Sequence, residues 1–376
     1  MTDFQKNVMQ VICPNCEVSG PLILQNWHCP QCGSAWEPLS YGKVNAGNIR
    51  AEEKSLWRYR DWMDVSIDEP IFLGAGGTPL LNANFQGREV LFKTEYLNPS
   101  GSFKDRGTEV MINVLNGLGA KRVVEDSSGN AGASLAAYAA RAGILAEIYV
   151  PESASPLKLE QIKMYGAQVK LIPGTRENAS LAVQAVVENG AVYASHAWHP
   201  AYLLGQQTAA WEVWEQLGHR APDMWVTPVG QGGHFLGIWL GFKRLLDEGM
   251  IDHIPQMVAV QSAQMAPIHK IFNENSSELP EMDHSQRTIA EGVVVAKPIR
   301  WKRIMDALHE SNGFTIAIEE EGILPARKEL AHLGFFVEPT SALATAALAR
   351  VFQKTKPTDT IVVSLTGSGL KVPITQ

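Results

Sequence analysis

Short apolar runs alternate with longer amphipathic stretches along most of the chain beyond about residue 72. Runs of this kind are typical of buried strands, and the stretches between them have the spacing and length of helices. Strands separated by helices of about 10–15 residues indicate βαβ units and parallel sheets. The first half of the pattern predicts, in order, strand 90–93, helix 105–118, strand 122–124, helix 131–142, strand 146–150, helix 155–165, strand 169–172 and helix 178–188.

The second half of the chain repeats this alternation. It predicts strand 224–228, helix 235–248, strand 257–260, helix 340–353 and strand 360–365. Residues 273–287 are rich in Asn, Ser, Glu and Asp and are expected to form a loop. A further helix is expected over 52–63, in a connector that precedes the alternating region. Residues 1–40 are short, cysteine-bearing and rich in turn residues, so we expect them to form a unit of their own.

Composition and charge exclude several classes of protein. The 376 residues are 45% hydrophobic and 19% charged, which is ordinary for a globular chain and long enough for more than one domain. The formal net charge of -7 argues against nucleic acid as a partner. We find neither the plan of a signal peptide nor an apolar run long enough to cross a membrane, so a cytoplasmic protein is expected.

The four cysteines lie in two pairs near the start of the chain, Cys13 with Cys16 and Cys29 with Cys32, separated by twelve residues. Two such CxxC turns favour a tetrahedral zinc held by four thiolates. Four free structural cysteines are the alternative, and His28 is an alternative ligand. Zinc here would be structural, because four thiolates leave no open position for water. Acidic residues around the cysteines favour a packing or regulatory role over nucleic-acid binding.

A lysine lies in a turn between a predicted strand and a predicted helix. The segment 98–107 reads Asn-Pro-Ser-Gly-Ser-Phe-Lys-Asp-Arg-Gly and places Lys104 at the helix N-terminus. The positive end of the helix dipole disfavours an ammonium group and favours the free amine that a Schiff base requires. Taken alone, Lys104 is equally compatible with a solvated surface charge.

Segment 98–107 resembles the lysine signature of threonine synthases, which belong to the fold type II group of pyridoxal-5'-phosphate (PLP) enzymes. The resemblance runs from about Gly76 to Lys371. It implies two open α/β domains with parallel sheets and PLP in the cleft between them, and a homodimer. It makes Lys104 the Schiff-base lysine and the general base. The domains expected are the ribbon 1–40, a large PLP-binding domain of 41–104 and 201–376, and a small domain of 105–200.

The resemblance also assigns the loops that follow the strands. Ser127, Ser128 and Gly129 would grip the substrate carboxylate, and Asn130 would bind the 3'-oxygen of the cofactor; a plain helix cap formed by Ser127 or Ser128 is the alternative. The PLP phosphate would be held by the glycine loop, which on its own is also compatible with a tight turn: Gly230, Gln231, Gly232, Gly233 and His234.

Two further residues match the family. Thr366 would meet the pyridine nitrogen, and a neutral hydroxyl there suits elimination and replacement reactions. Lys158 would contact the substrate, although a solvated helix lysine is the alternative. The segment 338–342 is expected to open a helix near the cofactor.

The chain departs from threonine synthases where the substrate phosphate would bind. Tyr202 falls where the family has a phosphate-binding arginine, and His196 or His199 would have to compensate. The triplet Ala290-Glu291-Gly292 looks like that of serine/threonine dehydratases. The resemblance therefore implies a lyase that makes L-threonine and phosphate from O-phospho-L-homoserine. The alternatives are β-elimination or β-replacement on serine, threonine or a related amino acid, and a non-catalytic PLP-binding protein.

Overall fold

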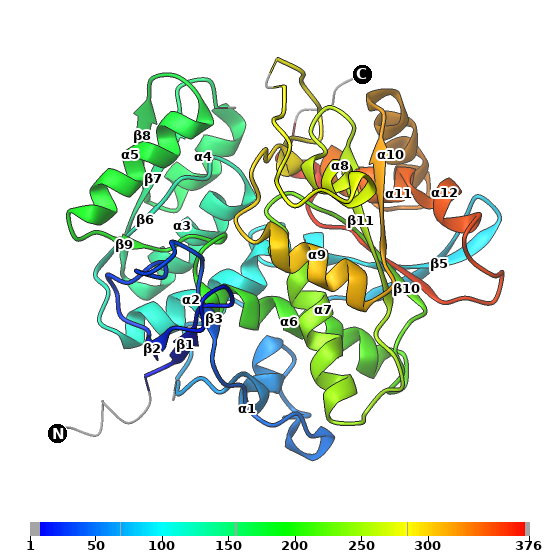
Figure 1. Ribbon diagram of the computed structural model, residues 1–376, viewed down its shortest axis with the longest axis horizontal. Coiled ribbons are helices and arrows are strands. Elements are labelled where there is room, and N and C mark those ends of the chain that lie inside the picture. Colours follow the sequence, from blue (N-terminus) through cyan, green and yellow to red (C-terminus); the bar gives the residue numbers. More distant parts are fainter. Residues whose placement is uncertain (1–7, 68, 155, 284, 373–376) are drawn as a thin grey trace. The chain divides into compact units, whose positions relative to one another are not determined.

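The computed structural model describes residues 8–67, 69–154, 156–283 and 285–372. The chain divides into two compact units (Figure 1). Unit 1 comprises the described residues up to Gly76 together with Asn98–Ser100 and Lys104–Gln206. Unit 2 comprises Gly77–Leu97, Gly101–Phe103 and the described residues from Gln207 onward. The domain boundaries drawn from the sequence stay a prediction.

Unit 1 begins with a small antiparallel sheet in the order β2-β1-β3, formed by β1 (Gln10–Ile12), β2 (Ser19–Pro21) and β3 (Glu37–Pro38). Buried side chains on this sheet and its turns form a core of their own, and Val114 and Leu118 pack against that core. The ribbon is thereby attached to the helix that starts at Lys104. Its core residues are Val11, Cys13, Leu22, Cys29 and Trp36.

The larger sheet of unit 1 is parallel and has the order β8-β7-β6-β9. Its strands are β6 (Arg122–Glu125), β7 (Leu145–Pro151), β8 (Gln168–Ile172) and β9 (Val192–Tyr193). The helices of this part of the chain are α2 (Lys104–Gly117), α3 (Asn130–Ala142), α4 (Pro156–Met164), α5 (Arg176–Glu188) and α6 (Pro200–Gln216), of which α6 continues into unit 2.

Unit 2 contains a six-stranded sheet in the order β12-β11-β10-β13-β5-β4. Its strands are β4 (Leu80–Phe85), β5 (Arg88–Lys93), β10 (Met224–Pro228), β11 (Gln256–Ser262), β12 (Phe314–Ile318) and β13 (Ile361–Ser364). All neighbours are parallel except β4, which pairs antiparallel with β5 at the edge. The helices are α7 (Gly233–Asp247), α8 (Pro267–Glu274), α9 (Trp301–Glu310), α10 (Ile323–His332), α11 (Pro339–Ala346) and α12 (Leu348–Phe352).

Most elements predicted from the alternation are present within a few residues of their expected bounds, and the mixed α/β class with parallel sheets is confirmed. The helix expected over 52–63 is wrong. A 3-10 turn at Leu56–Tyr59, capped by the Ser55 hydroxyl, leads into α1, which spans only Arg60–Met63. The helix expected over 340–353 is two helices that meet at Ala347. The loop expected from 273 begins only after α8 ends at Glu274.

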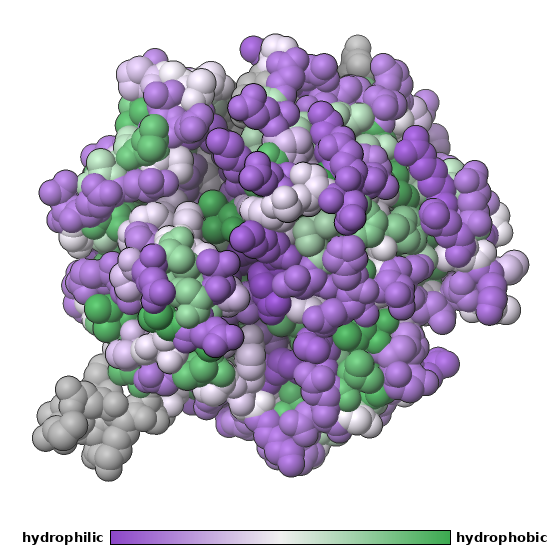
Figure 2. All heavy atoms as spheres, viewed as in Figure 1, coloured by the Kyte–Doolittle hydropathy of each residue, from purple (hydrophilic) through white to green (hydrophobic). Residues whose placement is uncertain are grey.

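Among the described residues, no helix is long and apolar enough to cross a membrane. Polar side chains cover most of the face shown in Figure 2, and apolar side chains occur there in separate small groups. The apolar strands are instead covered inside each unit. In unit 2, the strands β10, β11 and β13 lie under α11, and their side chains belong to one large buried cluster.

Candidate active site

The glycine loop lies in unit 2 between β10 and α7. Gly232 is the N-cap of α7, has a φ of 82° and contributes no side-chain cap, so the first amides of a 15-residue helix face the loop. A Cβ on Gly232 would overlap Cδ1 of Ile304, and one on Gly230 would come within 2.8 Å of the Gly292 carbonyl oxygen. Exposed amides and the positive end of a helix dipole suit a phosphate group.

The two polar members of the loop have fixed partners. Gln231 accepts a hydrogen bond from the backbone N–H of Ile299 at 3.1 Å. Nε2 of His234 lies 3.0 Å from the Ser364 hydroxyl, which also accepts a hydrogen bond from the Trp225 indole N–H at 2.8 Å. His234 therefore ties the loop to the end of β13, the strand beside β10.

Thr366 lies two residues beyond β13 and is buried. Its hydroxyl is 3.1 Å from that of Ser341 in α11, and the Ser341 hydroxyl also accepts the backbone N–H of Gly367 at 2.8 Å. The helix predicted to open at 338–342 is α11, which begins at Pro339. Because β10 and β13 are parallel neighbours, Thr366 and the glycine loop lie at the same edge of the sheet.

Phe103, the residue that precedes Lys104, belongs to this edge of unit 2. Its backbone N–H donates to the Thr366 carbonyl oxygen at 3.0 Å. Its ring lies 4.7 Å from the His234 ring, centroid to centroid. Both contacts fix the turn that immediately precedes Lys104.

Lys104 is the first residue of α2 in unit 1, as the sequence predicted. The next residue, Asp105, is fully buried and accepts hydrogen bonds from the Ser100 backbone and hydroxyl at 2.6 and 2.5 Å and from the Ser134 hydroxyl at 2.6 Å. These bonds join the lysine loop, the first turn of α2 and α3. The sequence analysis assigned no role to Asp105, although an acidic residue directly after the lysine was a visible signal.

The Ser127–Asn130 segment connects β6 to α3 in unit 1. Asn130 is the first residue of α3, and its N-cap is Gly129, which provides no side-chain cap. A plain cap by Ser127 or Ser128 is therefore not formed, and the Ser127 hydroxyl instead accepts the Gly129 N–H at 3.4 Å. A Cβ on Gly132 would overlap the Ser127 carbonyl oxygen, so the loop folds closely over the first turn of α3.

Glu125 and His196 meet at the carboxyl ends of the neighbouring strands β6 and β9. Nδ1 of His196 lies 3.1 Å from Oε1 of Glu125, and the His196 backbone N–H donates to Oε2 at 3.1 Å. Burial raises the pKa of Glu125 well above its ordinary value and lowers that of His196 well below its own. Sequence reasoning missed Glu125, whose one signal was a carboxylate that ends an apolar strand.

Tyr202 and His199 lie in the segment that follows His196. Tyr202 is fully buried, and a Cβ on Gly107 would overlap its ring, so the ring fills the space between α6 and α2. His199 is 7% exposed, and its backbone N–H donates to the Ser195 carbonyl oxygen at 2.9 Å. Lys158 lies in α4, and its side chain is outside the described part of the structure.

Comparison with known families decides the chemistry of these loops. The sequence profile described as "Pyridoxal-phosphate dependent enzyme" matches residues 71–367, which include the lysine loop, the Ser127–Asn130 segment, the glycine loop and Thr366. The chain belongs to the pyridoxal-phosphate dependent enzymes.

Relatives of this enzyme include known threonine synthases. That of Methanocaldococcus jannaschii is 35% identical over 341 residues, which cover 88% of this chain and 84% of the relative. That of Synechocystis sp. is 36% identical over 324 residues, covering 84% and 82%. Among solved structures, maize serine racemase aligns with a TM-score of 0.68 at 25% identity, covering 79% of this chain and 89% of that one. A threonine deaminase from T.th. aligns with a TM-score of 0.68 at 25% identity, covering 80% and 94%. The enzyme is accordingly of the lyase type.

The residues present fit PLP. In unit 2, the glycine loop presents uncapped helix amides to an anion, and the buried Thr366 hydroxyl lies at the same sheet edge. In unit 1, Lys104 and Asn130 begin the packed helices α2 and α3. Each unit thus supplies a part of the donor set that the cofactor requires.

The four cysteines of the enzyme come together in the ribbon. Their sulfur atoms all lie within 4.8 Å of one another, with 3.4 Å between Cys13 and Cys32 and 3.5 Å between Cys16 and Cys29. Gly33 closes the second turn at a φ of 72°. Four thiols gathered around one point are the donor set of a structural zinc site.

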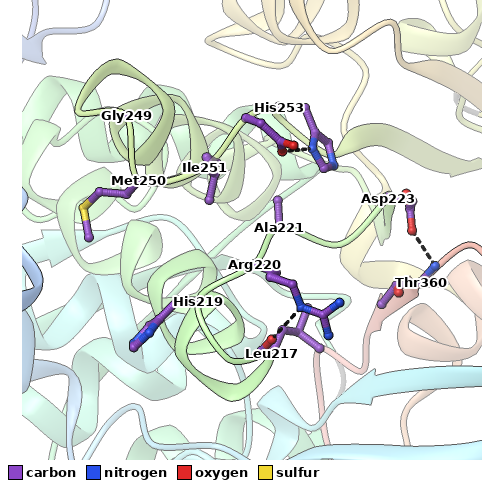
Figure 3. A pocket seen from close by; sticks show the side chains of 11 residues that line it. Leu217, His219, Arg220, Ala221, Asp223, Gly249, Met250, Ile251, His253 and Thr360 are labelled. Carbon is purple, nitrogen blue, oxygen red and sulfur yellow. Dashed lines mark hydrogen bonds and ion pairs between the residues drawn. The ribbon is translucent and has the colours of Figure 1, made fainter.

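Figure 3 shows a surface hollow of about 540 Å³ in unit 2 that is unrelated to these loops. Asp223 and Thr360, which line it, directly precede β10 and β13, and the Asp223 carboxylate accepts the Thr360 N–H at 2.7 Å. The hollow therefore lies at the amino ends of these strands. Ligands of parallel α/β sheets bind beyond the carboxyl ends, where the glycine loop and Thr366 are.

Proposed function

We propose that this enzyme is a threonine synthase, which converts O-phospho-L-homoserine and water to L-threonine and phosphate. The observation that carries the proposal is similarity to threonine synthases over 84–88% of the chain, at 35–36% identity. The intact lysine loop, glycine loop and Thr366 support it, because this reaction uses all three.

PLP, when bound, withdraws electrons from the substrate carbons next to the amino group. Lys104 would bind the cofactor covalently and then move protons at those carbons. The backbone amides and hydroxyls of Ser127–Gly129 would orient the substrate carboxylate, and Asn130 would donate to the 3'-oxygen. The glycine loop would hold the cofactor phosphate, and the Thr366 hydroxyl would pair with the pyridine nitrogen.

The second phosphate, that of the substrate, requires donors other than Tyr202. Its buried ring fills the space against Gly107, so Tyr202 serves packing and does not replace the arginine. His196 is held neutral by burial and lies against Glu125, which also makes it a poor partner for a dianion.

A second candidate function is β-elimination or β-replacement on serine, threonine or a related amino acid. The triplet Ala290-Glu291-Gly292, which resembles that of the dehydratases, packs on the glycine loop, since a Cβ at Gly230 would meet the Gly292 carbonyl oxygen. Threonine deaminase is also among the similar structures. A non-catalytic PLP-binding protein is the remaining alternative.

Turnover of O-phospho-L-homoserine by the PLP-loaded enzyme tests the proposal. Threonine and phosphate should appear in equal amounts, and Lys104→Ala should abolish both. A normal cofactor spectrum without turnover would reject threonine synthase. Ammonia release from serine or threonine would then establish the second candidate, and a yellow protein inert towards all of these substrates would establish the third.

Two further features belong to the same proposal. We propose a structural zinc ion at Cys13, Cys16, Cys29 and Cys32, supported by the convergence of their sulfur atoms. We also propose that the enzyme acts as a homodimer, as the resemblance implies.

A further inference from the structure

Glu125 and His196 are more tightly enclosed than a surface ion pair. Their side chains are 1% and 9% exposed, and His196 engages both oxygens of Glu125, one by the ring and one by the backbone N–H. The pairing of β6 with β9 brings the two residues together although 71 positions separate them in the sequence. Buried titratable groups held in this way cluster at functional sites.

Within unit 1, this pair adjoins the first turn of α2. Lys104 and Gly107 are three positions apart and therefore share a face of the helix. The Tyr202 ring packs on Gly107 and lies 6.1 Å from the His196 ring, centroid to centroid. Lys104 also interacts electrostatically with both Glu125 and His196. The lysine, the carboxyl and the imidazole thus form one cluster.

The charges in this cluster depend on one another. Burial favours the protonated carboxyl and the neutral imidazole, and Asp126 further raises the pKa of Glu125. A positive charge on Lys104 acts in the opposite direction and favours the Glu125 carboxylate. Opposite charges in a buried site therefore appear and disappear together. The other titratable groups that face the cluster are Asp126, Arg176, Tyr193, Tyr202 and Asp105.

We propose that Glu125 is the internal proton acceptor for Lys104 and that His196 is the residue that positions its carboxyl. When the Lys104 ammonium becomes an amine, the Glu125 carboxylate becomes the acid, so one proton changes place and the net charge of the cluster is constant. The proposal rests on the proposed function in that Lys104 is the cofactor-binding lysine. It gives Lys104 a route to the nucleophilic amine that needs no proton transfer to bulk water.

Competitive labelling of Lys104 in the cofactor-free, full-length chain tests this proposal. The rate of labelling by an amine-reactive reagent, measured at each pH by mass spectrometry, gives the pKa of the Lys104 amine. Glu125→Gln removes the negative charge that favours the ammonium form. The pKa should therefore fall by about one unit or more. His196→Asn should lower it in the same direction by less, because only the ring contact is lost.

Glu147→Gln is the matched control, because it makes the same change on the neighbouring strand β7, where Glu147 pairs with Arg122 at 2.7 Å. An unchanged Lys104 pKa in a folded Glu125→Gln chain would overturn the proposal. If Glu125→Gln fails to fold, His196→Asn decides in the same way. The pH dependence of the bound cofactor's absorbance should shift in parallel. Labelling requires no substrate, so absence of threonine formation would reject the proposed function and leave this result standing.

Discussion

At the scale of single residues, Glu109 shows how burial alone can make stability depend on pH. It is a fully buried residue of α2, and its carboxylate accepts hydrogen bonds from the Trp57 indole at 2.6 Å and from the backbone N–H groups of Leu73 and Ala75 at 3.3 Å. These bonds attach the connector that precedes unit 2 to the lysine-bearing helix. Burial nevertheless raises the pKa of Glu109 to about 7.

The first prediction follows from that pKa. Because the folded-state pKa lies above the unfolded value, the stability contributed by Glu109 is present at low pH and is lost as the pH rises through about 7. Between pH 5 and 8, the free energy of unfolding should fall by about 2 kcal/mol more in the wild type than in Glu109→Gln. Urea denaturation at both pH values measures the difference. Equal pH dependence in the two proteins would contradict the pKa shift.

Gly232 gives a second prediction. Gly232→Ala should destabilise the chain by about 1–2 kcal/mol for the left-handed backbone, with a further cost for the overlap with Ile304. Gly218→Ala is the control, because Gly218 also has a positive φ, of 67°, but has no atom within 4 Å of its Cβ position. PLP affinity, measured by absorbance titration, should weaken at least roughly tenfold in Gly232→Ala. Equal affinity in both variants would remove the glycine loop from the cofactor site.

At the scale of elements, the sequence pattern predicted well where a strand is buried on both faces. The runs at 224–228 and 257–260 are uniformly apolar, and they became β10 and β11. It failed for β4, an edge strand interrupted by Asn82 and Asn84, because half-exposed strands have no continuous apolar run. It also failed for 52–63, where three buried aromatic residues reflect tertiary packing rather than helical periodicity.

The third prediction concerns the ribbon as an element. The purified chain should contain about one zinc ion per molecule, and a strong chelator should remove it and lower the thermal unfolding temperature, because four thiolates around a metal close this fold. Cys29→Ser should show the same loss without chelator and little further effect with it. Metal analysis and thermal unfolding provide the measurements. A metal-free wild type that is insensitive to the chelator would mean four structural thiols instead.

At the scale of the whole molecule, the cofactor should stabilise the folded chain. A ligand that binds the folded state alone adds about 2.7 kcal/mol at a concentration one hundred times its dissociation constant. PLP should therefore raise the unfolding temperature of the wild type, and by much less in Lys104→Ala, which retains only the non-covalent contacts. Differential scanning fluorimetry at several PLP concentrations measures both. An equal shift in the two proteins would place the covalent bond at another lysine.

The candidate site could be predicted from the sequence where its residues are contiguous. The lysine loop, the Ser127–Asn130 segment and the glycine loop each follow a strand or open a helix, and the structure places them so. The pairing of Glu125 with His196 could not be predicted, because it depends on β9 lying beside β6. The packing role of Tyr202 was equally hidden, since it depends on a glycine in another helix.

The ribbon also touches the segment that carries His196. The Trp27 ring lies edge-on to Trp198 at 4.7 Å and to Tyr193 at 5.3 Å, all within unit 1. During synthesis, Trp27 leaves the ribosome roughly 10–30 s before Trp198, at about 5–20 residues per second. Local contacts and a metal would let the ribbon fold first, so for this interval its apolar surface has no partner. The order of synthesis thus makes the ribbon a finished surface against which the later strands β6 and β9 assemble.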